Sequence, residues 1–293
     1  MAQPALSPDA AAPRPGMVAA RARRGLASAS ALSLALLGAF ALLAIAAPWV
    51  WHGDPLLQLS DGLDAVGMPL PPSWAHPMGT DDLGRDVLAR WLVGARASLW
   101  VGLFATALAG AIGGAVGILS GYFRGWVDLA LMRLTEVVMA FPTLLLAIGL
   151  SAVLPSSPWM VVLTLGLVGW TAIARVVRAS ALSVREQEFI EASRAIGAPH
   201  GWIIARHVLP NVAPILASLL TLKLADMLLL EAALSFLGLG VRLPDPSWGN
   251  MMQGGQAYFY SAPWLIAMPG FGILAVVLAA NVLGDRWGEK GKA

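Results

Sequence analysis

Residues 186–211 read EQEFIEASRAIGAPHGWIIARHVLPN and lie between two long apolar stretches. A charged insert in such an apolar chain needs a physical reason, because charged side chains are costly in lipid. Its charged and titratable residues are Glu186, Glu188, Glu191, Arg194, His200, Arg206 and His207. The pattern is typical of a docking surface for a soluble partner. An amphipathic helix lying on the membrane surface explains it equally well.

The apolar residues of the insert have helical spacing and are interrupted once. Gly197 breaks the pattern, and Pro199 suits the first turn of a second helix. Leu209 and Pro210 are expected to close that second helix before the next apolar stretch begins. The stripe of the first helix, which we expect to rest on the ends of the neighbouring spans, consists of Phe189, Ile190, Ala192 and Ile196.

The composition indicates a protein that crosses a membrane several times. Of the 293 residues, 58% are hydrophobic and 12% are charged, whereas soluble domains carry about 25% charged residues. The mean hydropathy of +0.72 agrees. A formal charge of +2 is too small to suggest nucleic-acid binding. The chain has no cysteine, which excludes disulfides, thiolate metal sites and a cysteine nucleophile.

We expect an all-α fold with six transmembrane helices, each needing about 20 apolar residues. The first apolar run is uncharged and longer than the roughly 7–15-residue core of a signal peptide, so it predicts an uncleaved helix. The expected organisation is a disordered cytoplasmic tail at 1–24, a first transmembrane helix at 25–51, an extracytoplasmic segment at 52–96, a core of five transmembrane helices at 97–284 that includes the insert at 185–210, and a cytoplasmic tail at 285–293.

Within this core, prolines and glycines suggest where helices end and how they pack. Pro155 and Pro158 separate the third span, which starts near Val127, from the fourth. Small residues spaced by four line one helix face and let helix backbones approach closely. In the second span these residues are Gly113, Gly117 and Gly121.

The distribution of lysine and arginine predicts the orientation. With six spans, fourteen of these residues fall on the side of the insert and of both termini, and four fall on the opposite side. Cytoplasmic loops carry the excess of Lys and Arg. The insert and both termini are therefore expected in the cytoplasm.

Among the charged residues expected inside spans, five are candidates for a translocation path or for pairing within the membrane. Each costs about 2.5–3.5 kcal/mol at mid-membrane, so it should form a pair or face an aqueous cavity. Structural ion pairs and the lining of a translocation path both remain open. The residues are Arg133, Glu136, Lys223, Asp226 and Glu231, the last lying toward the outer end of its span.

The insert resembles the "EAA" loop of ATP-binding-cassette (ABC) importer permeases, which reads E-A-A, three residues, G, nine residues, I-x-L-P. The matching residues are Glu191, Ala192, Gly197, Leu209 and Pro210, with Ser193 in place of the third small residue and His207 in place of the isoleucine. The RHVLPN at 206–211 is similar to the dipeptide, oligopeptide and nickel branch. Further similarity to the second, C-type permease of this branch lies in MGTD at 78–81, GRD at 84–86, GARASL at 94–99, GYF at 121–123, AFP at 140–142, EAALSFLGLG at 231–240 and PSWGNM at 246–251.

This resemblance implies a type I ABC importer permease fold in the bacterial inner membrane. The insert would be the coupling helix on a cytoplasmic ATPase, through Glu191, Ala192, Ser193, Gly197, Leu209 and Pro210. The sequence has no G-x-x-x-x-G-K-[ST] loop, so the chain itself would bind no cofactor and separate subunits would hydrolyse ATP. The implied partners are membrane lipid, a second permease, two ATPase subunits and an extracytoplasmic substrate-binding protein. The implied cargo is di- or oligopeptides, with nickel or glutathione as alternatives.

Two other functions compete with this one. A stand-alone secondary transporter would explain the charges within spans but gives no reason for the insert. An intramembrane protease would use a serine such as Ser151, yet a serine nucleophile needs a base within reach and none of the four histidines lies in an apolar span. The aromatic residues of 244–260 fit an interfacial belt or a contact with the binding protein.

Overall fold

The computed structural model describes residues 54–155 and 157–290, with side chains to 284, and a few isolated positions between 34 and 46. The first expected span at 25–51 and the tail at 1–24 therefore lie outside the described residues, apart from those positions. Within them the fold is helical, with two isolated β-bridges and no longer strand. The elements are α2 (Val87–Phe123), α3 (Gly125–Met139), α4 (Thr143–Val153), α5 (Pro158–Arg185), α6 (Glu188–Ala195), α7 (His200–Ile203), a π-helical turn η1 (Ile204–Val208), α8 (Leu209–Phe236), α9 (Trp248–Gly255), a 3-10 turn η2 (Gln256–Tyr258) and α10 (Trp264–Lys290).

Four described helices are long and apolar enough to cross a membrane. They are α2, α5, the continuous helix His200–Phe236 and α10 up to Gly284. Helices α3 and α4 are long and apolar enough only when taken together, and they meet at an angle of 86°, so they form either a fifth, broken span or a re-entrant loop. The described residues thus account for four or five of the six expected spans.

Helix α2 begins at Val87, ten residues before residue 97, where the sequence suggests that the second span starts. The carboxylate of Asp86 caps it by accepting a hydrogen bond of 2.9 Å from the Ala89 amide. The glycine face packs against α5 as expected. A Cβ on Gly113 would lie 2.5 Å from the Trp170 carbonyl oxygen, and one on Gly117 2.6 Å from that of Ala174. Only glycine at these positions permits the backbones of α2 and α5 to lie so close together.

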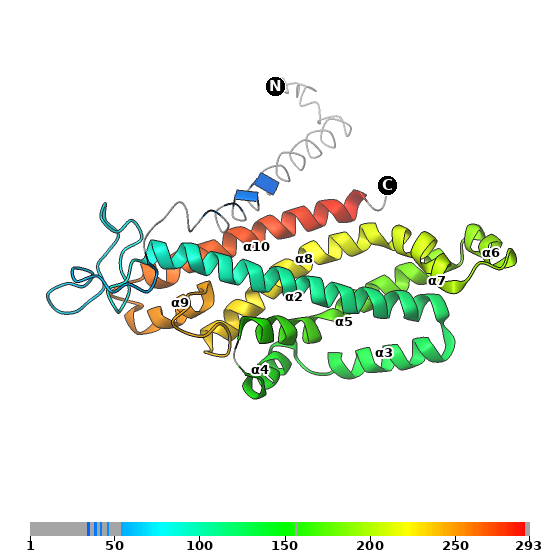
Figure 1. The fold of residues 1–293 in the computed structure, drawn as a ribbon, viewed down its shortest axis with the longest axis horizontal. Helices are drawn as coiled ribbons and strands as arrows, with labels where there is room; N and C mark the ends of the chain where they lie inside the picture. The colour runs from blue at the N-terminus through cyan, green and yellow to red at the C-terminus, as the bar shows by residue number, and fades with distance from the viewer. Residues whose placement is uncertain are drawn as a thin grey trace, which may run out of the picture.

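The third span is not one straight helix, which corrects the expectation of a single span from near Val127 to Pro155. Helix α3 ends at Met139 and α4 begins after Pro142. Proline has no amide hydrogen and disfavours helical dihedrals at the residue before it, so the chain bends at Phe141. As a result α3 and α4 lie along one side of the bundle formed by α2, α5, α8 and α10 (Figure 1).

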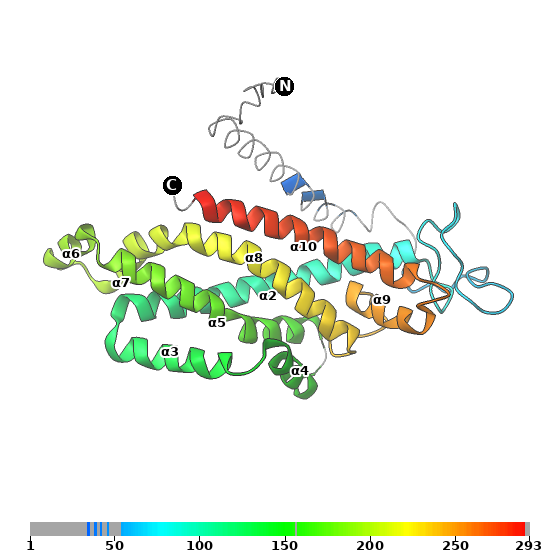
Figure 2. The same ribbon diagram turned by 180° about the vertical axis from the view of Figure 1, so that it is seen from behind.

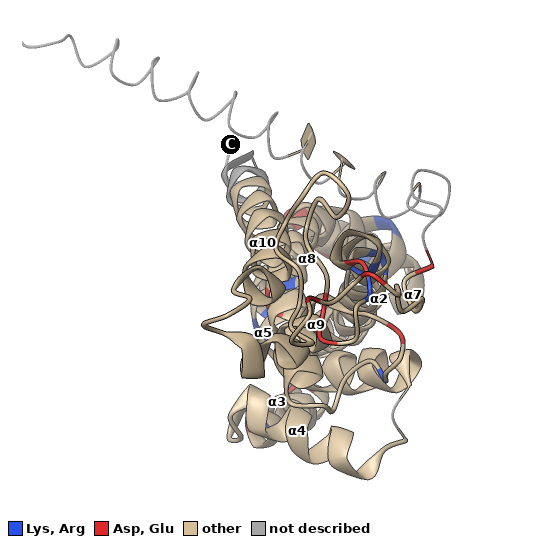
Figure 3. Ribbon diagram, turned by 90° about the vertical axis from the view of Figure 1, so that its left-hand side faces the viewer, with Lys and Arg blue, Asp and Glu red and all other residues tan. Residues whose placement is uncertain are grey.

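The molecule is elongated, and its two ends differ. The segment 54–86 and α9 lie at one end, and α6 and α7 lie at the other (Figure 1). Seen from the first end, the loops carry acidic residues (Figure 3). The segments expected on opposite sides of the membrane therefore lie at opposite ends of the molecule.

Candidate functional site

The corner between α6 and α7 depends on the backbone of Gly197. This residue has φ of +80°, a left-handed conformation that side chains disfavour, although a Cβ would meet nothing within 4 Å. The Gly197 amide donates to the Arg194 carbonyl at 3.0 Å, and the Ala198 amide donates to the Ser193 carbonyl at 3.1 Å. These two bonds form a Schellman motif, which ends α6 and turns the chain toward α7.

The corner has a buried underside. Ile190 of α6 and Ile203 of α7 have no exposed surface, and both belong to a core cluster that includes Tyr122 and Ala181. The α6–α7 corner is thus anchored on the ends of α2 and α5.

The opposite side of the corner is exposed and partly apolar. Phe189, Ile196 and Trp202 are exposed at 42%, 82% and 48%. Glu191 is exposed beside them and forms no ion pair with any described residue. Of the four stripe residues expected to rest on the spans, Ile190 is buried as expected, whereas the expectation is wrong for Phe189, Ala192 and Ile196, which are exposed. We call this exposed set of Phe189, Glu191, Ala192, Ile196 and Trp202 the corner surface.

The two departures from the EAA pattern contact each other. Ser193 Oγ lies 3.3 Å from His207 Nε2 and donates to the Phe189 carbonyl at 2.7 Å. The His207 ring lies 5.6 Å from the Phe189 ring and 5.1 Å from the Trp202 ring. His207 therefore supports two aromatic side chains of the corner surface from below.

The second helix of the insert does not close at Leu209 and Pro210, contrary to the sequence-based expectation. The chain is helical from His200 to Phe236. Because Pro210 has no amide hydrogen, the preceding turn widens, and the Leu209 amide donates to Ile204 in a π-type bond. The second helix of the insert and the span that follows it are thus one continuous helix, on which Leu209 and Pro210 are both exposed.

Two further contacts join the insert to the other helices near this end. Tyr122 Oη lies 2.9 Å from His200 Nδ1, and Arg124 Nη1 lies 3.3 Å from Glu186 Oε1. The first contact joins the end of α2 to the start of α7. The second joins Arg124, between α2 and α3, to Glu186, just before α6.

The five charged residues considered for a translocation path do not lie together in the structure. Four of them form two ion pairs, and the fifth, Glu231, is buried by itself. Arg133 and Glu136 pair at 2.9 Å with exposed side chains. Lys223 and Asp226 pair at 3.2 Å, with 13% and 62% of their side chains exposed. Each pair lies within a single helix. Glu231 is fully buried and accepts a hydrogen bond of 2.7 Å from Ser235.

Sequence reasoning missed the ion pair between Asp128 of α3 and Arg178 of α5. The guanidinium binds both carboxylate oxygens, at 2.5 and 2.6 Å, and Ser120 of α2 also bonds Asp128. No local rule could find it, because 50 residues separate the partners. It fastens the start of α3 to the bundle.

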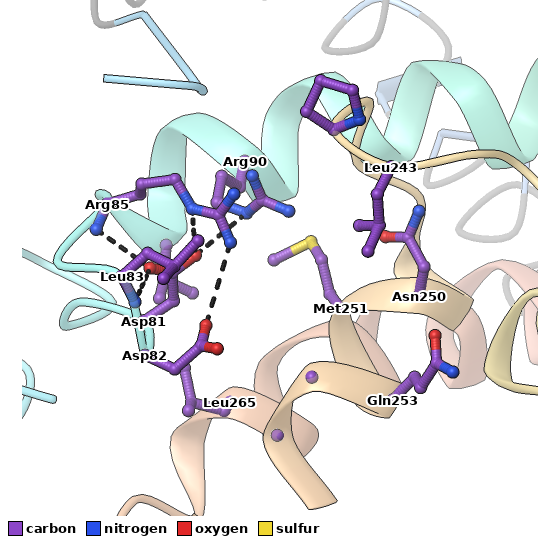
Figure 4. A pocket seen from close by; sticks show the side chains of 14 residues that line it. Asp81, Asp82, Leu83, Arg85, Arg90, Leu243, Asn250, Met251, Gln253 and Leu265 are labelled. Atoms are coloured by element: carbon purple, nitrogen blue, oxygen red, sulfur yellow. Dashed lines mark hydrogen bonds and ion pairs between the residues drawn. The ribbon is translucent and has the colours of Figure 1, made fainter. Parts of the chain in front are cut away.

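The opposite end contains a pocket of about 410 Å³ beside an Asp–Arg cluster (Figure 4). Arg85 Nε and Arg90 Nε bind Asp81 at 2.7 and 3.2 Å, and the Leu83 amide donates to the same carboxylate. Burial, followed by the charge of Asp81, raises the pKa of Asp82. The local turns and caps predicted here are present. The far wall of the pocket includes Asn250, Met251 and Gln253.

Comparison with known proteins places this geometry in a family. The family described as "binding-protein-dependent transport system inner membrane component" matches residues 113–289. The chain is 42% identical over 215 residues to a dipeptide transport system permease protein, DppC, of Alkalihalophilus pseudofirmus, covering 73% of this chain and 70% of that protein. It is 41% identical over 256 residues to a putative peptide transport system permease protein of Brucella suis biovar 1, covering 87% and 84%.

A solved structure shares the fold. A chain of the methionine ABC transporter MetNI, in an inward-facing conformation, superposes with a TM-score of 0.56 at 21% identity, covering 70% of this chain and 98% of that one.

Proposed function

The chain belongs to the binding-protein-dependent transport system inner membrane components, and from this premise we propose that it pairs with a second permease to form the path of an ABC importer for di- or oligopeptides. The peptide cargo is supported by the two relatives, which are named for dipeptide and peptide transport and align over most of this chain. The observation that carries the proposal is an exposed corner with a buried underside, on a helical bundle of this family.

The corner surface is the docking site for a cytoplasmic ATPase subunit. A partner needs an apolar contact and a charge that fixes its position. Phe189, Ile196 and Trp202 supply the apolar contact, and Glu191 supplies a charge for an Arg or Lys. Ser193 and Gly197 support the corner from within, and Leu209 and Pro210 carry its movement into α8. Two such ATPase subunits bind and hydrolyse ATP, and this chain carries no catalytic residue.

The protein lies in the bacterial inner membrane with six spans and both termini in the cytoplasm. Two facts support this topology: the excess of Lys and Arg on one side, and the separation of 54–86 from the corner surface along the long axis. The outer end, with its aromatic residues in 244–260, receives an extracytoplasmic substrate-binding protein.

Reconstitution tests the proposal. The tagged chain, purified with its associated subunits and placed in liposomes, should take up labelled dipeptide only when ATP and the loaded binding protein are present. Two ATPase subunits and a second permease should copurify. Uptake by the purified chain alone would instead establish a secondary transporter. ATP-driven uptake of a nickel chelate or glutathione, with no dipeptide uptake, would contradict the peptide cargo.

A further inference from the structure

A cleft of about 640 Å³ separates α3 from α5, on the side where α3 and α4 stand away from the bundle (Figure 2). Glu136 of α3 and Arg175 of α5 lie on its opposite walls. Glu136 is eleven residues from the start of α3 and Arg175 ten from the end of α5. A helix rises 1.5 Å per residue, so Glu136 and Arg175 each lie about 15 Å from the helix end nearest the corner. The two side chains therefore lie at a similar level along the bundle.

The charge on Arg175 is not neutralised by the described residues. No carboxylate among them lies within 4 Å, and the contact that its Nη1 makes is a weak one of 3.8 Å to the sulfur of Met139. One turn further on, by contrast, Arg178 is neutralised by Asp128. An exposed guanidinium without a carboxylate partner is costly in lipid, which favours water or a polar ligand on this side of α5.

The cleft carries an excess of one positive charge and also offers a carboxylate. Glu136 pairs with Arg133, and 62% of its side chain remains exposed. Arg175 therefore supplies the excess. A ligand carboxylate would neutralise Arg175, and an ammonium group on the same ligand could bind the exposed carboxylate of Glu136, which would then be shared with Arg133.

We propose that the α3–α5 cleft binds a zwitterionic short peptide, with its terminal carboxylate on Arg175 and its ammonium group on Glu136. This inference rests on the proposed function and names a contact of the cargo inside the path. The planar guanidinium matches a carboxylate with two hydrogen bonds. Met132 and Met139 line the cleft with flexible, polarisable side chains that adapt to different peptide side chains. The volume falls within the range of about 300–1,000 Å³ of ligand pockets.

The absence of cysteine from the natural chain permits a direct test. In membranes holding the complete importer, Met132→Cys places one thiol in the cleft. A charged, water-soluble thiol reagent should label it, and dialanine should slow the labelling. The matched control is Leu278→Cys, on an exposed apolar face of α10, which the reagent should not label.

Arg175→Gln is introduced into the Met132→Cys chain. Because a charge-assisted pair is lost, the dialanine concentration that halves the labelling rate should rise by at least about tenfold. Arg175→Lys keeps the charge and should retain part of the protection, which separates charge recognition from misfolding. Dialanine amide, which lacks the carboxylate, should protect neither the parent nor the variant.

Equal protection by dialanine and its amide, or no protection, would overturn the proposal. An unlabelled Met132→Cys would overturn it too, because a partner helix or lipid would then fill the cleft. ATP-driven dialanine uptake is measured in the same membranes. Uptake without protection rejects this site alone, whereas loss of uptake in the unmodified importer rejects the proposed function.

Discussion

At the scale of single residues, Gly197 is needed for its backbone conformation and not for lack of space. A side chain in the left-handed region costs about 1–2 kcal/mol, so Gly197→Ala should destabilise the corner by that amount and lower uptake. Gly201→Ala is the matched control, because a Cβ there also meets nothing within 4 Å and its φ is not in that region. Thermal unfolding of the purified complex checks this. Equal losses from both variants would contradict the role given to φ.

Glu191 supplies the charge of the corner surface. Glu191→Lys should lower both uptake and substrate-stimulated ATPase activity while the subunits still copurify, because the reversed charge repels the partner's basic residue. Glu188→Lys, an equally charge-reversing change on α6, should have the smaller effect. Normal uptake by Glu191→Lys would contradict docking through this carboxylate.

Ser193 and His207 are coupled through their contact, so neither is an independent departure from the family pattern. Ser193→Ala removes one neutral hydrogen bond and should cost about 1 kcal/mol of unfolding free energy. His207→Ala also removes the packing beneath Phe189 and Trp202 and should cost more. A double-mutant cycle on the purified complex measures the coupling. Strictly additive losses would show that the two side chains act separately.

At the scale of elements, the Asp128–Arg178 pair decides how α3 is held. Asp128→Asn should lower the unfolding free energy by about 1.5–3 kcal/mol, the range for hydrogen bonds to charged groups. Asp226→Asn, which breaks a pair within one helix whose carboxylate is 62% exposed, should cost less than about 1 kcal/mol. Thermal unfolding of the two variants compares them. A larger loss from Asp226→Asn would mean that the intrahelical pair, and not Asp128, stabilises the bundle.

Sequence patterns predicted most elements, because hydropathy and helical spacing are local properties. They located the core spans and the glycine face of α2. They predicted a helix–corner–helix insert from Gly197. They failed at two prolines. The chain bends between α3 and α4 at Pro142, whereas the helix continues through Pro210 by forming a wider, π-helical turn. The surrounding packing, which spacing does not report, decides between these outcomes.

Contacts between elements were the least predictable part of the candidate site. The Arg133–Glu136 and Lys223–Asp226 spacings gave pairs, since residues three apart share a helix face. The Asp128–Arg178 pair and the aromatic support of His207 depend on which helices become neighbours. The side of α6 that is buried likewise depends on α2 and α5 beneath it.

At the scale of the whole molecule, the two ends are chemically distinct. Acidic loops and an Asp–Arg pocket occupy one end, and the anchored corner occupies the other (Figures 1 and 3). The count of Lys and Arg in the loops predicts that the corner end lies in the cytoplasm. At the corner end, the Tyr122–His200 and Arg124–Glu186 contacts join the insert to the end of α2 and to the residue between α2 and α3.

The central claim is that the corner surface docks on an ATPase, and site-specific cross-linking tests it most directly. Ile196→Cys places a single thiol on that surface in a chain with no other cysteine. In the assembled importer, a short photoactivatable cross-linker on this thiol should capture the ATPase subunit. The same reagent on Asp64→Cys, in the outer segment, should not. Capture of the ATPase from Asp64→Cys, or its absence from Ile196→Cys in an importer that still transports, would contradict the account.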